Sequence, residues 1–175
     1  YTEPKMAEQV KKIRADYGLL DKTTVIVIED VRTVDNYVYK LINTAISNKL
    51  AVKYRRHPWM PEACNPMYNY VTYLKAHLTA DAINRGLVTT KTVAWIDFGF
   101  NHGGATYPKS EEFAVTLTDK GLSDKIHIFA VDELDNVPIF EIVRNMHTYI
   151  AGAVTIAPVI LWQELADLYR QAAIS

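Results

Sequence analysis

Asp97 is the residue whose position most clearly suggests chemistry. It directly follows Val93–Ile96, an apolar run typical of a buried strand, and it precedes Phe98 and Gly99, where glycine permits a turn. A carboxylate at a strand end can coordinate a hard divalent cation such as manganese or magnesium, and that cation can bridge a diphosphate. Because the segment supplies a single acid, the alternative that Asp97 simply caps a loop stays open.

Lys75 is the second candidate, on a segment with helical periodicity that begins near Met67. Tyr68 and Thr72 precede it by seven and three residues, so the three side chains share one face of the predicted helix. An ammonium group there could bind a phosphate or a sugar carboxylate. The alternative is a lysine that only faces water, since lysines on amphipathic helices are mostly exposed.

Two loop segments carry further polar candidates. Arg55 and Arg56 form a short basic run with His57, and arginine suits bidentate binding of phosphate. His102 lies in a glycine-containing loop after Asp97, where it could bind a metal ion or orient a substrate. A solvated turn and an incidental surface histidine are the respective alternatives.

Several function classes are excluded by what the sequence lacks. There is one cysteine, Cys64, so no internal disulfide can form and a reducing, cytoplasmic compartment fits best. No zinc spacing, nucleophile elbow, dinucleotide fingerprint or P-loop is present. The formal net charge of −1 provides no overall positive field for nucleic acid. The longest apolar stretch, Ile150–Trp162, is interrupted by Gly152 and Pro158, so no transmembrane segment is expected.

The elements that must position these residues alternate between strand and helix. The chain has 175 residues, of which 49% are hydrophobic, which suits one globular domain over residues 1–175. The predicted strands are Thr24–Ile28, Leu50–Tyr54, Thr92–Ile96 and Ile126–Val131, with Tyr149–Ile156 as strand or loop. The predicted helices are Pro4–Tyr17, Thr33–Ala45, Met67–Gly86, Pro138–His147 and a last one carrying Leu161, Leu165 and Leu168.

This alternation predicts an α/β domain with a mostly parallel, Rossmann-like sheet and helices on both faces. In such sheets ligands bind beyond the carboxyl ends of the strands. The polar residues that follow predicted strands, and that one pocket could therefore gather, are Asp30, Arg55, Arg56, Asp97 and Asp132.

Three segments together resemble one family of bacterial proteins. They are Pro66–Ala76, with its Tyr-Asn pair and Lys75, then Val93–Gly99, with Trp-Ile-Asp-Phe-Gly, and then His147–Ala153, with Gly152 before a helix that bears Trp162. In this order and at this separation they resemble the HtrL/YibB/WlaX family, and the resemblance extends from about Val25 onward.

The resemblance implies a glycosyltransferase with a GT-A-like fold, a nucleotide-sugar donor, and an acceptor glycan of the bacterial surface such as lipopolysaccharide or capsule. It implies a bacterial cytoplasmic protein, or one peripheral at the inner membrane. Asp97 would hold the divalent cation at the donor diphosphate, and Lys75 would face the donor. The residues expected around the donor are Arg55, Arg56, Tyr68, Asn69, Gly99, His102 and Gly152.

Three departures from the GT-A pattern keep alternatives open. Gly99 stands where an Asp-x-Asp pair would have its second acid, no strand precedes the first helix, and the chain ends soon after the Trp162 helix. We therefore expect a domain that is incomplete at both ends. A non-catalytic module that binds a sugar, a nucleotide or a protein partner is the main alternative, and an unrelated α/β hydrolase or phosphatase is a third. The oligomeric state stays open.

Overall fold

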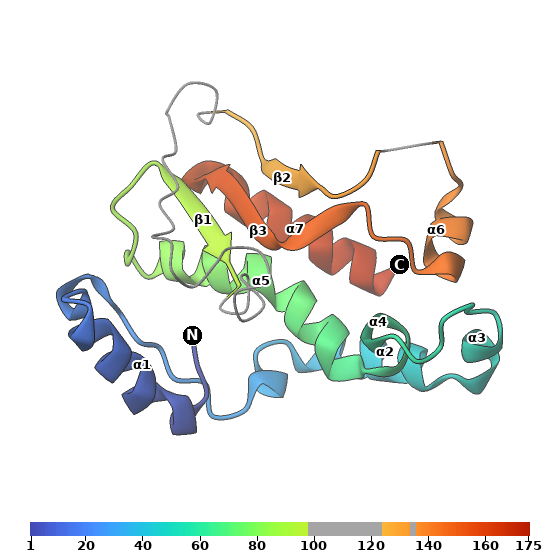
Figure 1. The fold of residues 1–175 in the computed structure, drawn as a ribbon, viewed down its shortest axis with the longest axis horizontal. Helices are drawn as coiled ribbons and strands as arrows, with labels where there is room; N and C mark the ends of the chain where they lie inside the picture. Colours follow the sequence, from blue (N-terminus) through green and yellow to red (C-terminus); the bar gives the residue numbers. More distant parts are fainter. Residues whose placement is uncertain (98–123, 134–135) are drawn as a thin grey trace.

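The computed structural model of the chain describes residues 1–97, 124–133 and 136–175 (Figure 1). The helices are α1 (Pro4–Asp16), α2 (Asn36–Ser47), α3 (Lys49–Lys53), α4 (Pro61–Cys64), α5 (Pro66–Asn84), α6 (Ile139–Asn145) and α7 (Trp162–Ile174). The short 3-10 turns are η1 (Leu20–Lys22), η2 (Val31–Thr33) and η3 (Val159–Leu161), and the strands are β1 (Thr92–Ile96), β2 (His127–Ala130) and β3 (Ile150–Pro158).

The sheet differs from the predicted one. Its three described strands have the order β1-β3-β2, and both pairings are antiparallel, so the prediction of a mostly parallel, Rossmann-like, GT-A-like sheet is wrong. Within Thr24–Ile28 only one residue, Val27, forms a bridge, which is an isolated parallel pairing with Thr2. The predicted strand Leu50–Tyr54 falls mostly in helix α3.

The error has a physical cause in the connection between β2 and β3. A parallel neighbour requires a crossover helix that packs on the face of the sheet. The intervening helix α6 has seven residues and lies beyond one end of the sheet, so the chain returns along β3 in the opposite direction (Figure 1). The sequence shows a strand, a helix and another strand in either case. Alternation alone therefore could not separate the two topologies.

Helix α5 is the central element of the described structure. It begins where the Asn65 side chain accepts hydrogen bonds from the backbone N–H groups of Met67 and Tyr68, at 3.0 and 3.2 Å, with Pro66 at the first helical position. It ends before Gly86, which adopts a φ of +69° that favours glycine. The sequence prediction of this helix is confirmed.

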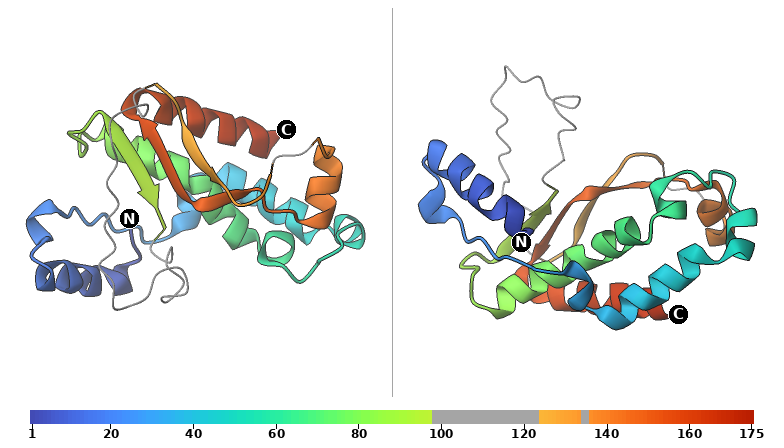
Figure 2. Two further views of the ribbon diagram at one scale, coloured as in Figure 1. Left: turned by 45° about the horizontal axis from the view of Figure 1, so that its top comes forward. Right: turned by 90° about the horizontal axis from the view of Figure 1, so that it is seen from below.

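Two hydrophobic clusters pack on different sides of α5. One cluster lies among α5, β3 and α7, and the other lies between α5 and α2. The first consists of Ala76, Ala80, Ala157, Trp162 and Ala166, and the second of Val38, Tyr70, Tyr73 and Leu74. Two further views show the strands forming one layer over α5 and α7 (Figure 2). A helix that is buried on several sides in this way fixes the positions of both layers.

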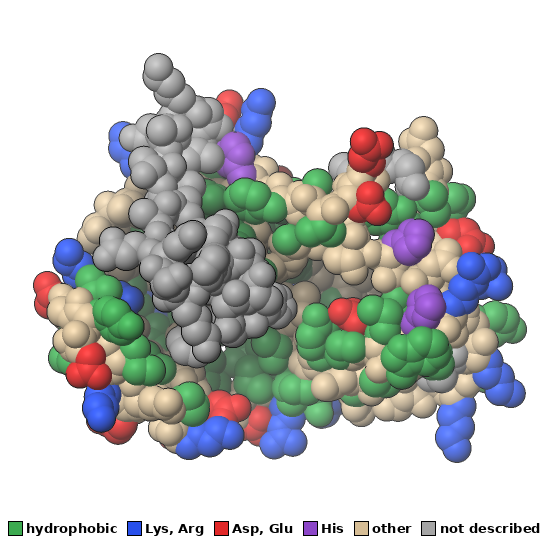
Figure 3. Space-filling view, in the orientation of Figure 1, with side chains coloured by type: hydrophobic (Ala, Val, Ile, Leu, Met, Phe, Trp, Pro, Cys, Tyr) green, Lys and Arg blue, Asp and Glu red, His purple; other side chains and the backbone are tan. Residues whose placement is uncertain are grey.

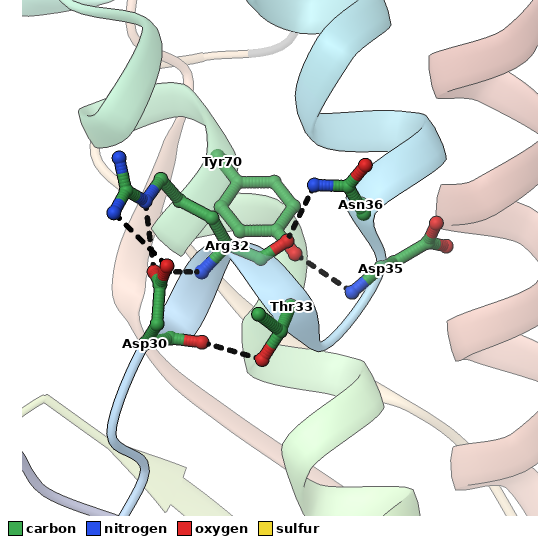
Figure 4. Close-up of polar contacts among 6 residues, drawn as sticks. All are labelled: Asp30, Arg32, Thr33, Asp35, Asn36 and Tyr70. Atoms are coloured by element: carbon green, nitrogen blue, oxygen red, sulfur yellow. Dashed lines mark hydrogen bonds and ion pairs between the residues drawn. The ribbon is translucent and has the colours of Figure 1, made fainter.

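The entry to α2 is held by a compact set of polar contacts (Figure 4). Asp30 caps η2 by accepting a hydrogen bond from the Arg32 backbone N–H at 3.0 Å, and its carboxylate also pairs with the Arg32 guanidinium at 2.8 Å. The Asp35 backbone N–H donates to the Tyr70 hydroxyl at 2.8 Å. Asp35 caps the helix through a 3.1 Å bond from the Val38 N–H, so α2 begins at Asn36 and not at the predicted Thr33.

The Asp35 carboxylate also joins α2 to the two longer helices. It accepts hydrogen bonds from the Tyr73 hydroxyl at 2.9 Å and from the Arg170 guanidinium at 3.1 Å. Burial raises the pKa of Asp35, but the hydrogen bonds from Val38, Tyr73 and Arg170 outweigh it and hold that pKa below its ordinary value. The carboxylate is therefore stabilised in its ionised form where three helices meet.

None of the described helices is long and apolar enough to cross a membrane. The longest, α5, has 19 residues and includes Lys75 and Asp81. The apolar stretch Ile150–Trp162 forms β3, η3 and the first residue of α7. For the described residues, the expectation of no transmembrane segment agrees with the structure.

Leu74→Ala should destabilise the protein by about 2–5 kcal/mol, because Leu74 is fully buried between α5 and α2 and its loss would leave a cavity. Val71→Ala, on the same helix but 44% exposed, is the matched control and should change stability by less than about 1 kcal/mol. Urea unfolding of both variants checks this. Equal losses would contradict the packing described here.

Stability should also fall as the pH drops below the ordinary histidine pKa of about 6.5. Burial lowers the pKa of His77, although the charges of Asp35 and Asp167 oppose this. Because the folded state then binds fewer protons than the unfolded state, the free energy of unfolding decreases as the pH falls from 6.5 toward the lowered pKa. Urea unfolding between pH 8 and pH 5 should show this decrease, and His77→Gln should reduce it. A pH dependence unchanged in the variant would refute the assignment.

Candidate functional site

Lys75 and Asp97 form an ion pair between α5 and the end of β1. The Lys75 Nζ lies 2.7 Å from the Asp97 Oδ2, and the two side chains are 17% and 32% exposed. Asp97 is the first residue after β1, and its backbone N–H donates to the Ala153 carbonyl at 2.8 Å, which extends the pairing with β3 by one residue. The acid therefore lies on a rigid element and remains accessible to solvent.

Two further contacts complete the cluster. The Lys75 ammonium donates to the Gly152 carbonyl at 2.8 Å, and the Trp95 Nε1 donates to the Asp97 Oδ1 at 2.6 Å. Both carboxylate oxygens of Asp97 thus accept a hydrogen bond. We call this set of residues, Lys75, Trp95, Asp97 and Gly152, the lysine-aspartate cluster. It brings together the three sequence segments on which the family resemblance was based.

Gly152 leaves space beside the ammonium group. A Cβ atom added there would lie 3.9 Å from the Lys75 Nζ, which is ordinary van der Waals contact. Gly152 is exposed and does not have a positive φ, so its backbone conformation does not require glycine. What the missing side chain provides is an open approach to the cation.

Tyr68 and Asn69 lie near the start of α5. Burial, a hydrogen bond to the Glu62 carboxylate, and the negative charges of Glu62 and Asp97 all raise the pKa of Tyr68. Tyr68 is therefore within electrostatic reach of both acids. The Asn69 Nδ2 donates to the Glu62 and Asn65 carbonyls at 2.9 and 3.1 Å, which holds α4 against α5.

The two arginines do not join the lysine-aspartate cluster. The Arg55 guanidinium donates to the Ala63 carbonyl and lines a cavity that Asn69 also lines. Arg56 is exposed, and its backbone N–H donates to the Arg144 carbonyl at 3.0 Å. The predicted gathering of both arginines with Asp97 in one pocket is not observed among the described residues.

The other predicted acids do not join the lysine-aspartate cluster either. Asp30 pairs with Arg32 at the entry to α2. Asp132 is exposed and follows Val131, whose N–H bonds to the Tyr149 carbonyl, whereas Asp97 bonds to Ala153. Asp132 therefore lies beside the residue that precedes β3, and among the described residues no contact joins it to the lysine-aspartate cluster. Two other predicted residues, Gly99 and His102, lie outside the described residues.

The described residues do not fit a metal site at Asp97. Among residues 1–97, 124–133 and 136–175, no three histidine, cysteine, aspartate or glutamate side chains are grouped closely enough to hold an ion. Asp97 is paired with an ammonium group, and a divalent cation would have to displace it. The charge of the carboxylate is already balanced by Lys75.

Sequence reasoning missed two residues of this region. Trp95 lies two positions before Asp97, and because side chains two apart share one face of a strand, its contact with that acid was predictable. Glu62 lies in a proline-marked segment that showed no periodicity, so nothing in the sequence indicated that one of its carboxylate oxygens would be buried.

Comparisons with known proteins agree with these motifs. The chain matches the family model described as a bacterial protein of unknown function (HtrL_YibB) over residues 1–174. It is 27% identical to protein HtrL of Escherichia coli strain K12 over 184 residues, which cover 98% of the chain and 59% of that relative, so the chain spans less than two thirds of its length. No solved structure matches. Because the family model covers nearly every residue, the chain belongs to the HtrL/YibB family of bacterial proteins.

Proposed function

We propose that the chain carries the donor-binding part of a glycosyltransferase that transfers a sugar from a nucleotide-sugar donor to a bacterial surface glycan. The observation that carries the proposal is the lysine-aspartate cluster, in which a partly buried cation is held by three chain segments and remains open beside Gly152. The proposal does not depend on a parallel sheet. It places the protein in the cytoplasm, with access to the inner membrane where surface glycans begin.

The chemistry follows from where charge develops during transfer. As the bond between the sugar anomeric carbon and the diphosphate oxygen breaks, negative charge grows on the departing nucleotide. The Lys75 ammonium has three N–H groups, and its contacts with Asp97 and Gly152 use two of them among the described residues. The third can donate to the diphosphate. A cation fixed before the reaction stabilises the leaving group without reorganisation.

Asp97 and Trp95 act as positioning residues in this proposal. The indole N–H fixes one carboxylate oxygen, and the other oxygen holds the ammonium group. Because Trp95 and Lys75 both lie on packed elements, their contacts with Asp97 restrict the movement of the ammonium group. The proposal assigns charge neutralisation to Lys75, and manganese or magnesium at Asp97 would require ligands from outside the described residues.

A non-catalytic module that binds a sugar or nucleotide is the second candidate. One observation favours it: Lys75 and Asp97 neutralise each other, so the ion pair needs no ligand in order to hold α5 against the sheet. Such a module would bind the same ligand class without turnover. Transfer of sugar to water or to an added glycan, measured as release of nucleotide, separates the two candidates.

Nucleotide sugars should stabilise the protein against heat. A ligand that binds only the folded state, at about 100 times its dissociation constant, adds roughly 2.7 kcal/mol, which a thermal-shift assay detects readily. We expect one class among UDP-, GDP-, CMP- and dTDP-sugars to raise Tm with or without manganese. The double variant Lys75→Met/Asp97→Asn should abolish the shift, because it removes the cation without leaving an unpaired buried charge.

Lys40→Met, which removes an exposed lysine on α2, is the matched control and should keep the wild-type shift. A shift that appears only with manganese would contradict the assignment of charge neutralisation to Lys75. If no donor class shifts wild-type protein, donor binding by this chain is disproved.

Gly152→Val should block donor binding while preserving the fold. The added side chain would occupy the space beside the Lys75 ammonium, and valine suits a strand better than glycine does. Ala151→Val, whose side chain points to the opposite face of β3, is the control and should retain the ligand-induced shift. Calorimetric titration with the donor found above checks both. Equal affinities in the two variants would contradict an approach past Gly152.

A further inference from the structure

A second concave site lies beside the lysine-aspartate cluster, between α2, α4, α5 and α6. Its volume is about 370 Å³, which falls within the range of roughly 300–1,000 Å³ usual for ligand pockets. Its polar lining includes Arg55, Glu62 and Asn69, and its apolar lining includes Ile46, Ile142 and Met146. We call it the Glu62 pocket. Hydrophobic, acidic and histidine side chains, together with lysine and arginine, occur on the surface at this end of the molecule (Figure 3).

The Glu62 carboxylate is incompletely satisfied. Its Oε2 atom is buried and has no hydrogen-bond partner among the described residues. Buried polar atoms in folded proteins nearly always have a partner, and a buried carboxylate oxygen left without one is destabilising. Because Glu62 lines the pocket, a ligand bound there can supply a hydrogen-bond donor to this carboxylate.

Two neighbouring side chains are fixed in position around the same space. The Asn69 Nδ2 is held by the carbonyls of Glu62 and Asn65, so the amide group is anchored. The Arg55 guanidinium donates one N–H to the Ala63 carbonyl, and its remaining N–H groups have no hydrogen-bond partner among the described residues. The pocket thus offers a charged acceptor and a charged donor on held side chains.

This combination selects one chemical class of ligand. An isolated carboxylate would favour a ligand with an ammonium group. Here the positive charge of Arg55, which lines the same pocket, opposes a cationic ligand and neutralises the charge of Glu62. A hydroxyl group both donates and accepts, so adjacent hydroxyls can satisfy Glu62 and Arg55 together. The apolar wall formed by Ile46, Ile142 and Met146 suits the C–H face of a ring.

We propose that the Glu62 pocket binds a neutral saccharide, with Glu62 accepting hydrogen bonds from its hydroxyl groups and Arg55 donating to them. Because the pocket lies next to the proposed donor site, we assign it to the acceptor sugar. This assignment rests on the proposed function. Tyr68 connects the two places, because its hydroxyl bonds to Glu62 while its pKa responds to the charge of Asp97. Lys75 lies two helical turns further along α5, about 10 Å.

The test uses the whole chain and neutral monosaccharides as probes, namely hexoses and N-acetylhexosamines. Saturation-transfer NMR should detect binding of at least one of them, and calorimetry should give its dissociation constant. Glu62→Gln should weaken binding about ten-fold, which corresponds to about 1.4 kcal/mol. Glu164→Gln, at an exposed acid on α7, is the matched control and should leave the dissociation constant unchanged.

Ile142→Trp is a second variant, which fills the pocket from α6 and should abolish saccharide binding. Thermal unfolding verifies that each variant is folded. Glu62→Gln should unfold at a temperature equal to or above that of wild type, because it removes a carboxylate whose Oε2 lacks a partner.

Each remaining outcome overturns the inference. The inference fails if no neutral saccharide binds wild-type protein, or if Glu62→Gln binds the saccharide as tightly as wild type does. It also fails if an amine such as glucosamine binds more tightly than its neutral counterpart. The donor titration separates the two proposals. Nucleotide-sugar binding without saccharide binding refutes this inference alone. Saccharide binding without nucleotide-sugar binding refutes the proposed function and the acceptor role of the pocket, but not saccharide binding by the pocket.

Discussion

The burial of α5 on several sides is the constraint on which the rest of the described structure depends. Tyr70 and Leu74 pack toward α2, while Ala76 and Ala80 pack toward β3 and α7. A helix held from more than one side cannot rotate without disturbing both clusters. The direction of every polar side chain on α5 is therefore determined by hydrophobic packing, and this packing delivers Lys75 to the end of β1.

The polar residues around α5 divide into two kinds of arrangement. Asp35 lies where three helices meet and is fully engaged with Tyr73, Arg170 and the backbone of α2, so its role is to hold the helices together. Asp97 is engaged as well, but its partner Lys75 retains bonding capacity at a solvent-accessible place. The two arrangements differ in what they join: Asp35 links three helices, whereas Lys75 and Asp97 link α5 to the end of β1 beside Gly152, which has no side chain.

Local structure was predictable from sequence where the pattern was long or well terminated. The helices before Gly18 and Gly86 and the strand ending at Ile96 were predicted nearly correctly, because periodicity and glycine turns are local signals. Pairing was not predictable, because it depends on distant segments: the β-branched run Thr24–Ile28 forms a single bridge. Lys75 and Asp97 both belong to well-predicted segments, although their contact was not itself predicted, whereas the burial of the Glu62 Oε2 atom depended on how irregular chain packs on α5.

Tyr68 has a consequence for the charge balance around the two regions. Burial and a hydrogen bond to Glu62 raise its pKa, and the charges of Glu62 and Asp97 raise it further. The phenol therefore keeps its proton at neutral pH and donates it in a hydrogen bond to Glu62, because another negative charge near two carboxylates would be unfavourable. A neutral hydrogen-bond donor thus lies within reach of both acids and adds no charge to either region.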